Sequence, residues 1–384
     1  MIDTVILSIP QGKFQILNHD RFTPSSLGLF QYPYYKVGRF FKCVQNPTKK
    51  EMKNGFYRPR LTLTKAIRSG GYQIDLKIEY SVPKLFFGNN FEELQEENFL
   101  RSIRLLQRAL YDMEVIVEFE DLENALVSGI HYSKNIHLTD HTTCHMVLDE
   151  LRKVDLSARI DIGSEKFRGG GHALHYKTNH LDIVFYDKIK DLEQAKISEK
   201  KAIEKDNAIQ LVLFDEIQNP NALQVFRMEV RLGNRQTIKK VFDKANVQYG
   251  SLTFSELFKL KKAKAVLGYF WNDVEKNSSL LNFRTENTFE FFHSLKANNP
   301  KISERKLLQL FGFIILGKEV GTKEMRKSLG YYGSKLKNNK WYALKKEIRE
   351  LKYDKAGNWQ AINSITEDIV KFEPVKTRNF IKIT

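Results

Sequence analysis

Apolar and polar residues alternate along many short stretches of this chain, at the period of two that a pleated strand imposes. The clearest stretch is residues 180–188, where every second residue from Leu181 to Phe185 is apolar and the intervening set includes Asp182 and Tyr186. Similar patterns predict strands over residues 1–10, 60–64, 72–80, 125–133, 157–162, 173–178, 181–186 and 222–232. Turns rich in Gly and Asn separate several of them, as at residues 69–71, 169–171 and 178–180.

Helical spacing replaces this alternation in other parts of the chain. Apolar residues recur at intervals of three and four over residues 92–113, and Thr139 or Asp140 can cap a helix that runs to about Lys153. A charged helix is expected over residues 187–205. After residue 235 the pattern is mostly helical, with helices predicted over residues 236–244, 254–274, 287–297, 304–313, 323–329 and 338–351.

This order of elements predicts an α+β fold. We expect an antiparallel β-sheet with packed helices, followed by a mostly helical and basic C-terminal region. Three regions follow from the pattern: residues 1–115, strand-rich and then helical; residues 116–250, a second sheet region; and residues 251–384, helical and basic.

The charge of the chain narrows the range of partners. The net charge is +16 and the pI is about 9.5. A balance of this size favours a polyanion, either nucleic acid or an acidic membrane surface. The basic residues after residue 255 are dispersed rather than set opposite an apolar face, which disfavours the membrane. The helices between residues 304 and 329 suggest a helix–turn–helix-like unit that grips duplex DNA.

Several classes of protein are excluded by what the sequence lacks. No apolar run is long enough to span a bilayer, and the first residues have no secretory signal, so we expect a cytoplasmic protein. The two cysteines, Cys43 and Cys144, make neither a disulfide framework nor a cysteine zinc site. A phosphate-binding loop of the Gly-x-x-x-x-Gly-Lys-Ser/Thr type is also missing.

Tyr186 and Lys188 are the candidates for catalysis. In a strand they point to the same face, where a phenol and an ammonium can act as a nucleophile and its charge partner. A phenol has an unperturbed pKa of about 10, so it needs a cation or a base nearby to attack a phosphodiester. Attack would give a 5′-phosphotyrosyl enzyme and a free 3′-OH, from which a polymerase can extend.

Candidate metal ligands lie in separate predicted strands that could present them on one face of a single sheet. His131 belongs to one strand and Glu229 to another, and His175 is the candidate for a third ligand. Imidazole and carboxylate together suit Mg²⁺ or Mn²⁺, and Mn²⁺ accepts the nitrogen more readily. Arg227 and Arg231, which flank Glu229 at alternate positions, can offset developing charge or contact DNA.

The N-terminal part of the chain offers a second candidate surface for DNA. Residues 11–60 interleave aromatic and basic residues and include Arg58 and Arg60, which can pair with phosphates. Packing at a sheet edge is the simpler explanation of the aromatic residues, and we favour it.

Each of these residues also has a simpler structural interpretation. A strand tyrosine is usually a packing residue, and Glu229 between two arginines is typical of a surface ion-pair ladder. His141 and His145 have the i, i+4 spacing of a helical zinc site, but the glutamate of that motif is absent and we assign them to a helix surface. His172 and His175 face opposite sides of a strand, so only one of them can reach the site.

Several short stretches, taken in order, resemble the rolling-circle replication initiators of the filamentous-phage gene II/gene X type, a family of phage and plasmid replication proteins. Each match is short, and the ordered set gives the resemblance its specificity. The stretches are residues 1–10, 77–90, 127–153, 185–188, 226–231 and 253–258.

The resemblance implies metal-dependent, site-specific nicking of a replication origin through a tyrosine, followed by strand rejoining. Tyr186 and Lys188 match the family's Tyr-x-Lys motif, and Glu229 matches the acid of its Arg-x-Glu strand. His131 stands where relatives carry an aspartate. The family is regarded as a divergent relative of the His-hydrophobe-His (HUH/Rep-like) endonucleases, although this chain has no His-x-His pair.

The implied partners are single-stranded or hairpin origin DNA, with a helicase and a polymerase from the host. Two other interpretations stay open. A conjugative relaxase or a single-strand transposase would use the same chemistry. A basic DNA-binding protein without catalysis would bind phosphate with a strong dependence on salt and form no covalent product.

Overall fold

In the computed structural model the chain has an α+β fold built on a large antiparallel sheet. The structure describes residues 1–31, 40–48, 51, 57–68, 71–138, 141–155, 165–168, 171–191, 223–278, 287–331, 334–353 and 360–375. The strand predicted over residues 157–162 and most of the helix predicted over 187–205 lie outside these ranges.

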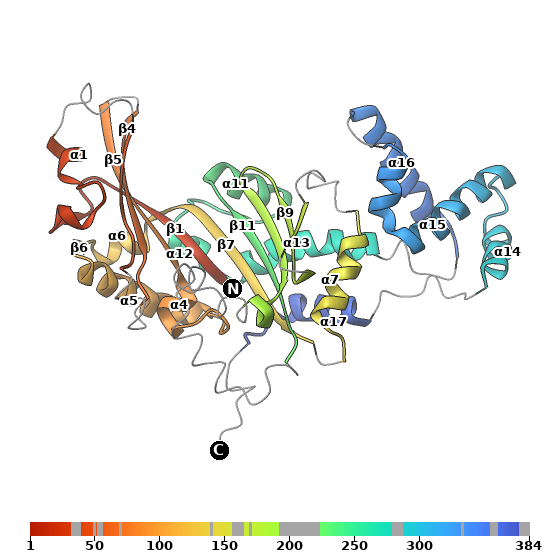
Figure 1. The fold of residues 1–384 in the computed structure, drawn as a ribbon, viewed down its shortest axis with the longest axis horizontal. Helices are drawn as coiled ribbons and strands as arrows, with labels where there is room; N and C mark the ends of the chain where they lie inside the picture. Colours follow the sequence, from red (N-terminus) through yellow and green to blue (C-terminus); the bar gives the residue numbers. More distant parts are fainter. Residues whose placement is uncertain are drawn as a thin grey trace, which may run out of the picture.

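Nine of the described strands form one sheet, in the order β3-β4-β5-β1-β7-β11-β10-β9-β8, with antiparallel pairing throughout (Figure 1). β1 lies between β5 and β7, so the first two predicted regions share this sheet. The strands are β1 (Ile2–Pro10), β3 (Phe40–Gln45), β4 (Arg60–Arg68), β5 (Gly71–Ser81), β7 (Leu126–His137), β8 (Glu165–Arg168), β9 (Ala173–Lys177), β10 (Leu181–Asp187) and β11 (Val225–Leu232). A separate pair joins β2 (Gln15–Ile16) to β6 (Val115–Ile116).

Helices surround this sheet and continue beyond it. The elements of the first half are α1 (Leu27–Gln31), α4 (Val82–Phe87), α5 (Phe99–Asp112), α6 (Phe119–Glu123) and α7 (Cys144–Lys153), with 3₁₀ turns η1 (His19–Arg21) and η2 (Glu96–Asn98). Those of the second half are α11 (Arg235–Lys244), α12 (Phe254–Leu257), α13 (Leu260–Ser278), α14 (Thr288–Asn298), α15 (Glu304–Ser328), α16 (Lys335–Glu350) and α17 (Gln360–Lys371). No helix of the described part is long and apolar enough to cross a membrane.

The alternation in the strands separates an apolar face of the sheet from a polar one. On the apolar face, Phe185 of β10 stacks on Phe226 of β11, with ring centroids 5.9 Å apart, and Trp271 of α13 packs edge-on against both rings. The main core extends along this face, from β1 to helix α17. The helices therefore bury one side of the sheet, and the opposite side of its central strands carries the polar residues of the candidate site.

The C-terminal helices α14, α15 and α16 have a second hydrophobic core of their own, which includes Phe291, Leu310 and Trp341. Figure 1 shows them beyond α7, at the end of the molecule opposite β4 and β5. The helices predicted over residues 304–313 and 323–329 both fall within α15, which consists of two helices that meet at a non-helical kink at Gly321.

One predicted helix boundary was wrong. The helix predicted from residue 139 begins at Cys144, because the Thr143 side chain accepts a hydrogen bond from the backbone N–H of Met146. His141 precedes the helix with φ +62°, so it does not share a helical face with His145.

Candidate functional site

The register of the central strands places several sequence candidates on one face. His131 of β7 is paired with Arg231 of β11, and Tyr186 of β10 with Arg227. Glu229 lies between the two arginines along β11 and is paired with Ser133 of β7. Since side chains at alternate positions share a face, Tyr186, His131 and Glu229 come from three adjacent strands to the same side of the sheet.

A β-bulge brings a further carboxylate to this face. Ile2 of β1 is paired with Tyr132, yet Thr4 is paired with His131, so Asp3 is an extra residue in the strand. Such a bulge shifts the alternation by one position. Both Ile2 and Val5 consequently belong to the core, while Asp3 points to the polar side.

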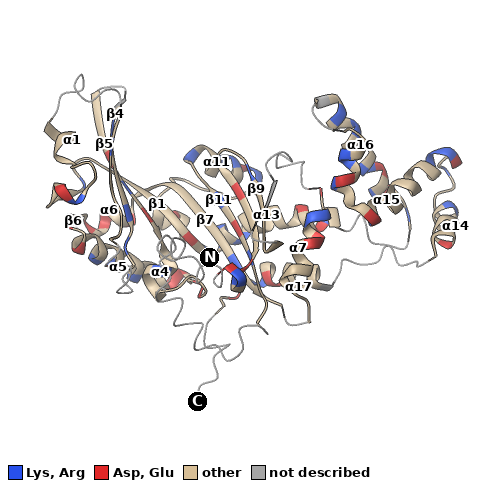
Figure 2. Ribbon diagram, viewed as in Figure 1, with Lys and Arg blue, Asp and Glu red and all other residues tan. Residues whose placement is uncertain are grey.

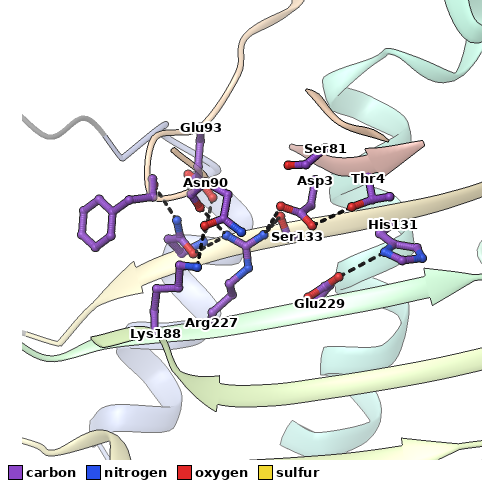
Figure 3. A network of polar contacts seen from close by, with 12 residues as sticks. Asp3, Thr4, Ser81, Asn90, Glu93, His131, Ser133, Lys188, Arg227 and Glu229 are labelled. Carbon is purple, nitrogen blue, oxygen red and sulfur yellow. Dashed lines mark hydrogen bonds and ion pairs between the residues drawn. The ribbon is translucent and has the colours of Figure 1, made fainter. Parts of the chain in front are cut away.

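Asp3, His131 and Glu229 form the only group of three potential metal ligands among the residues that the structure describes. One ligand atom from each lies within 4.8 Å of the other two. Asp3 and Glu229 are buried, and the His131 side chain is 23% exposed. The Nδ1 atom of His131 lies 3.3 Å from Oε1 of Glu229 (Figure 3).

Arginines balance the charge of both carboxylates. Nε and Nη2 of Arg231 donate to the two oxygens of Glu229 at 2.9 and 3.1 Å. Burial alone would raise the pKa of Glu229, but Arg231 and the hydrogen bond from His131 hold this pKa well below its usual value. Oδ1 of Asp3 lies 2.8 Å from Nη2 of Arg227 but lacks the geometry of a hydrogen bond, so this buried oxygen keeps an unused lone pair.

The Tyr186 hydroxyl lies at the edge of this group and donates to Oε2 of Glu229 at 3.5 Å. Tyr186 is 8% exposed. Burial raises its pKa well above 10, and the nearby Arg227 only partly opposes this effect. The phenol therefore keeps its proton at neutral pH in the structure as it stands.

Arg227 is the centre of a buried network beside the three ligands (Figure 3). Its guanidinium donates to the carbonyl oxygen of Asn90 at 2.8 Å, to Oδ1 of Asn135 at 3.1 Å and to Oγ of Ser133 at 3.0 Å. Lys188 follows directly after β10 and donates to Oδ1 of Asn90 at 2.7 Å. Burial, with a smaller contribution from Arg227, lowers the pKa of Lys188 to about 7.

The structure places the remaining sequence candidates elsewhere. His175 of β9 lies on the same face but one strand further out, with Nδ1 3.6 Å from Asp182, and it is not part of the three-residue group. Arg58 is held by Asp112, whose carboxylate lies 2.9 Å from its guanidinium. Arg60 lines a surface hollow on the other half of the sheet.

This hollow has a volume of about 680 Å³ and is open on the polar face of β4, β5 and β1. Its basic lining residues are Lys42, Arg60, Lys77 and Arg235, and its acidic ones are Asp75 and Glu79. Ile6, which lines it, is paired with Gly129, two residues from His131 in β7. The hollow therefore begins next to the three ligands, one same-face cross-strand pair along β1 and β7 from His131.

Asp3 is the residue of the group that the sequence does not predict. Strict alternation along β1 would place Asp3 on the same side as Val5, in the core. The available signal was a charged residue within an otherwise apolar or hydroxyl-bearing strand, since such a residue needs a buried partner.

Comparison of the chain with models of protein families, with curated proteins and with solved structures finds no match.

Proposed function

We propose that this protein nicks and rejoins DNA at a specific origin through Tyr186, in a reaction that depends on Mg²⁺ or Mn²⁺, and that it initiates rolling-circle replication. The observation that supports this best is the convergence of Asp3, His131 and Glu229 beside the Tyr186 hydroxyl. A nucleophile and a candidate cation site from adjacent strands are what tyrosine-mediated phosphodiester cleavage requires.

The donor set fits a divalent cation. Two carboxylates and one imidazole suit Mn²⁺, and Mg²⁺ if water completes its shell. Oδ1 of Asp3 is in an ion pair with Arg227 but accepts no hydrogen bond, so this buried oxygen has a lone pair that a cation could use. When bound, the cation would stabilise negative charge on a phosphate oxygen and on the phenolate.

Side chains of the protein would supply the nucleophile, stabilise charge on the phosphate and bind the flanking strand. Tyr186 forms the bond to phosphorus as the bond to the 3′ oxygen breaks. The phenol proton passes to solvent, and the 3′ oxygen takes a proton from solvent to leave as the free 3′-OH. Because Tyr186 is 8% exposed, we expect its hydroxyl to turn away from Glu229 when DNA binds. Arg227 and Arg231 lie close enough to offset charge on the phosphate, and the hollow that contains Arg60 would receive the flanking strand.

One observation favours the alternative of DNA binding without catalysis. Arg231 already occupies both oxygens of Glu229, so an ion-pair network accounts for this part of the site without a cation. A relaxase or a single-strand transposase would share the proposed chemistry and differ only in the DNA that it cuts.

The deciding experiment is the formation of a covalent adduct. The protein is incubated with Mn²⁺ and single-stranded DNA from the region of its own gene, and the products are separated on a denaturing gel. We expect an adduct that requires the metal and disappears in Tyr186→Phe. Tyr176→Phe is the matched control, because this tyrosine is also buried but donates to the carbonyl of Leu151 on the other face. An adduct that survives in Tyr186→Phe would place the nucleophile elsewhere, and no adduct with any origin fragment would favour binding alone.

A further inference from the structure

The second half of α15 and helix α16 form a helix–turn–helix arrangement. Gly321, with φ +84°, breaks α15 and leaves a short helix over residues 322–328. Gly330, with φ +66°, follows this short helix, and α16 begins after the N-cap Ser334, so only a few residues separate the two helices. Two helices joined by a short turn with a glycine are the framework in which a second helix is presented to DNA.

Asp155, just after α7, forms hydrogen bonds to the buried sides of both helices. The buried carboxylate of Asp155 accepts from Nη1 of Arg326 at 3.1 Å, from Nε1 of Trp341 at 2.6 Å and from Nζ of Lys345 at 3.1 Å. Arg326 belongs to the short helix, and the other two belong to α16. The anchor therefore holds both helices in one orientation against the main body of the protein.

The outer face of α16 is exposed and basic. Exposed residues in its first half include Leu336, Lys337, Asn339 and Lys340. The figure shows basic residues along α16 at the outer end of the molecule (Figure 2). Over residues 325–346 the sequence has seven Lys or Arg and no Asp or Glu.

Two of these lysines are available to a partner. Arg326 and Lys345 are committed to Asp155. Neither Lys337 nor Lys340 is in an ion pair with any residue that the structure describes. Lys337 lies in the first turn of α16, where the helix dipole adds to the positive potential.

We propose that the short helix over residues 322–328 and α16 are a duplex DNA-binding unit that places the first half of α16 in the major groove. An exposed helix of this length fits that groove, Lys337 and Lys340 would contact phosphates, and the Asn339 amide would face base edges. The unit lies apart from the polar sheet face with Tyr186, so one protein would hold duplex DNA and act on a neighbouring single strand. The choice of DNA as the partner rests on the proposed function.

The test measures binding in the absence of cleavage. Full-length protein is titrated in EDTA into a labelled duplex of about 30 base pairs, three turns of B-DNA, at several salt concentrations. For Lys337→Ala/Lys340→Ala we expect about tenfold weaker binding near 0.1 M salt and a log–log salt slope smaller by about 2. The control is Arg104→Ala/Arg108→Ala, two exposed arginines on α5 at the far end of the molecule, which should bind duplex as the unchanged protein does.

Three results would overturn the proposal: unchanged duplex binding in the lysine variant, an equal loss in the arginine control, or unchanged protein that binds duplex no more tightly than single-stranded DNA or RNA of the same length. Because the assay contains no divalent cation, it does not depend on nicking. A protein that forms no covalent adduct can still show the expected loss of duplex binding in the lysine variant. A protein that nicks single strands can still lack it.

Discussion

The hydroxyl of Tyr186 lies 3.5 Å from Oε2 of Glu229, and the two groups have opposite pKa shifts. Burial raises the pKa of the phenol well above 10, while Arg231 holds the pKa of Glu229 well below 4.5 despite burial. Transfer of the phenol proton from Tyr186 to Glu229 is energetically unfavourable. Glu229 alone is therefore a poor base for Tyr186, and activation of the phenol requires additional positive charge.

The first prediction follows from these pKa directions. At saturating Mn²⁺ the rate of adduct formation should rise with pH between about 6 and 8, by up to tenfold per unit, because only the deprotonated phenol attacks. Quenched time courses on single-stranded DNA measure this rate. A rate that is flat or falls across this range would show that loss of the Tyr186 proton does not limit the reaction.

The second prediction separates the three-residue group from His175. His131→Gln should weaken Mn²⁺ binding, measured by titration calorimetry, by at least about tenfold, since the imidazole is one of three ligands. His175→Gln is the matched control, because His175 lies beside Asp182 and outside the group. Equal effects of the two substitutions would contradict the assignment of Asp3, His131 and Glu229 as the site.

Strand alternation explains why much of this site can be predicted from the sequence. Tyr186, Glu229 and His131 are each on the polar face of a short strand, and a period of two is sufficient to assign that face. The pairing of β7, β11 and β10 as neighbours depends on contacts between residues about 40 or more positions apart in the chain, which no local pattern encodes. Predicted strands could therefore supply the residues of a site but not their distances.

Asp3 and Asp155 show what local patterns miss. The bulge at Asp3 reverses the alternation of β1, so the rule that assigned the other residues assigns this one to the wrong face. Asp155 is enclosed by Arg326, Trp341 and Lys345, all more than 170 residues later in the chain. Only the three-dimensional packing reveals that one carboxylate joins the C-terminal helices to the rest of the protein.

The third prediction concerns Lys188. Its pKa is lowered from 10.5 to about 7 by burial, so between these values the unfolded chain binds a proton that the folded protein does not. The free energy of unfolding should therefore rise with pH between about 7 and 10.5, by a total on the order of a few kcal/mol. Urea unfolding at pH 7, 8 and 9 measures it. Lys188→Met should remove this contribution, so the two proteins should differ in the slope of stability against pH; parallel slopes would contradict a lowered pKa.

The fourth prediction concerns the place where α15 meets the end of α7. A Cβ atom on Gly321 would lie 2.8 Å from Cβ of Lys153 and 2.9 Å from its backbone oxygen, and the φ of +84° strains any other residue. Gly321→Ala should therefore lower the free energy of unfolding by about 1–3 kcal/mol or more, because the short helix must move away from Lys153.

The control for this substitution lies in the same helix. Gly312 has a helical backbone and open space around the position of a Cβ atom, so Gly312→Ala should stabilise the protein by about 0.5–1 kcal/mol. Urea unfolding of the two variants gives the comparison. Since Asp155 anchors Arg326 only when residues 322–328 are in place, Gly321→Ala should also weaken duplex binding in EDTA, whereas Gly312→Ala should leave it unchanged. Equal stability of the two variants would mean that the contact at Lys153 does not position the short helix.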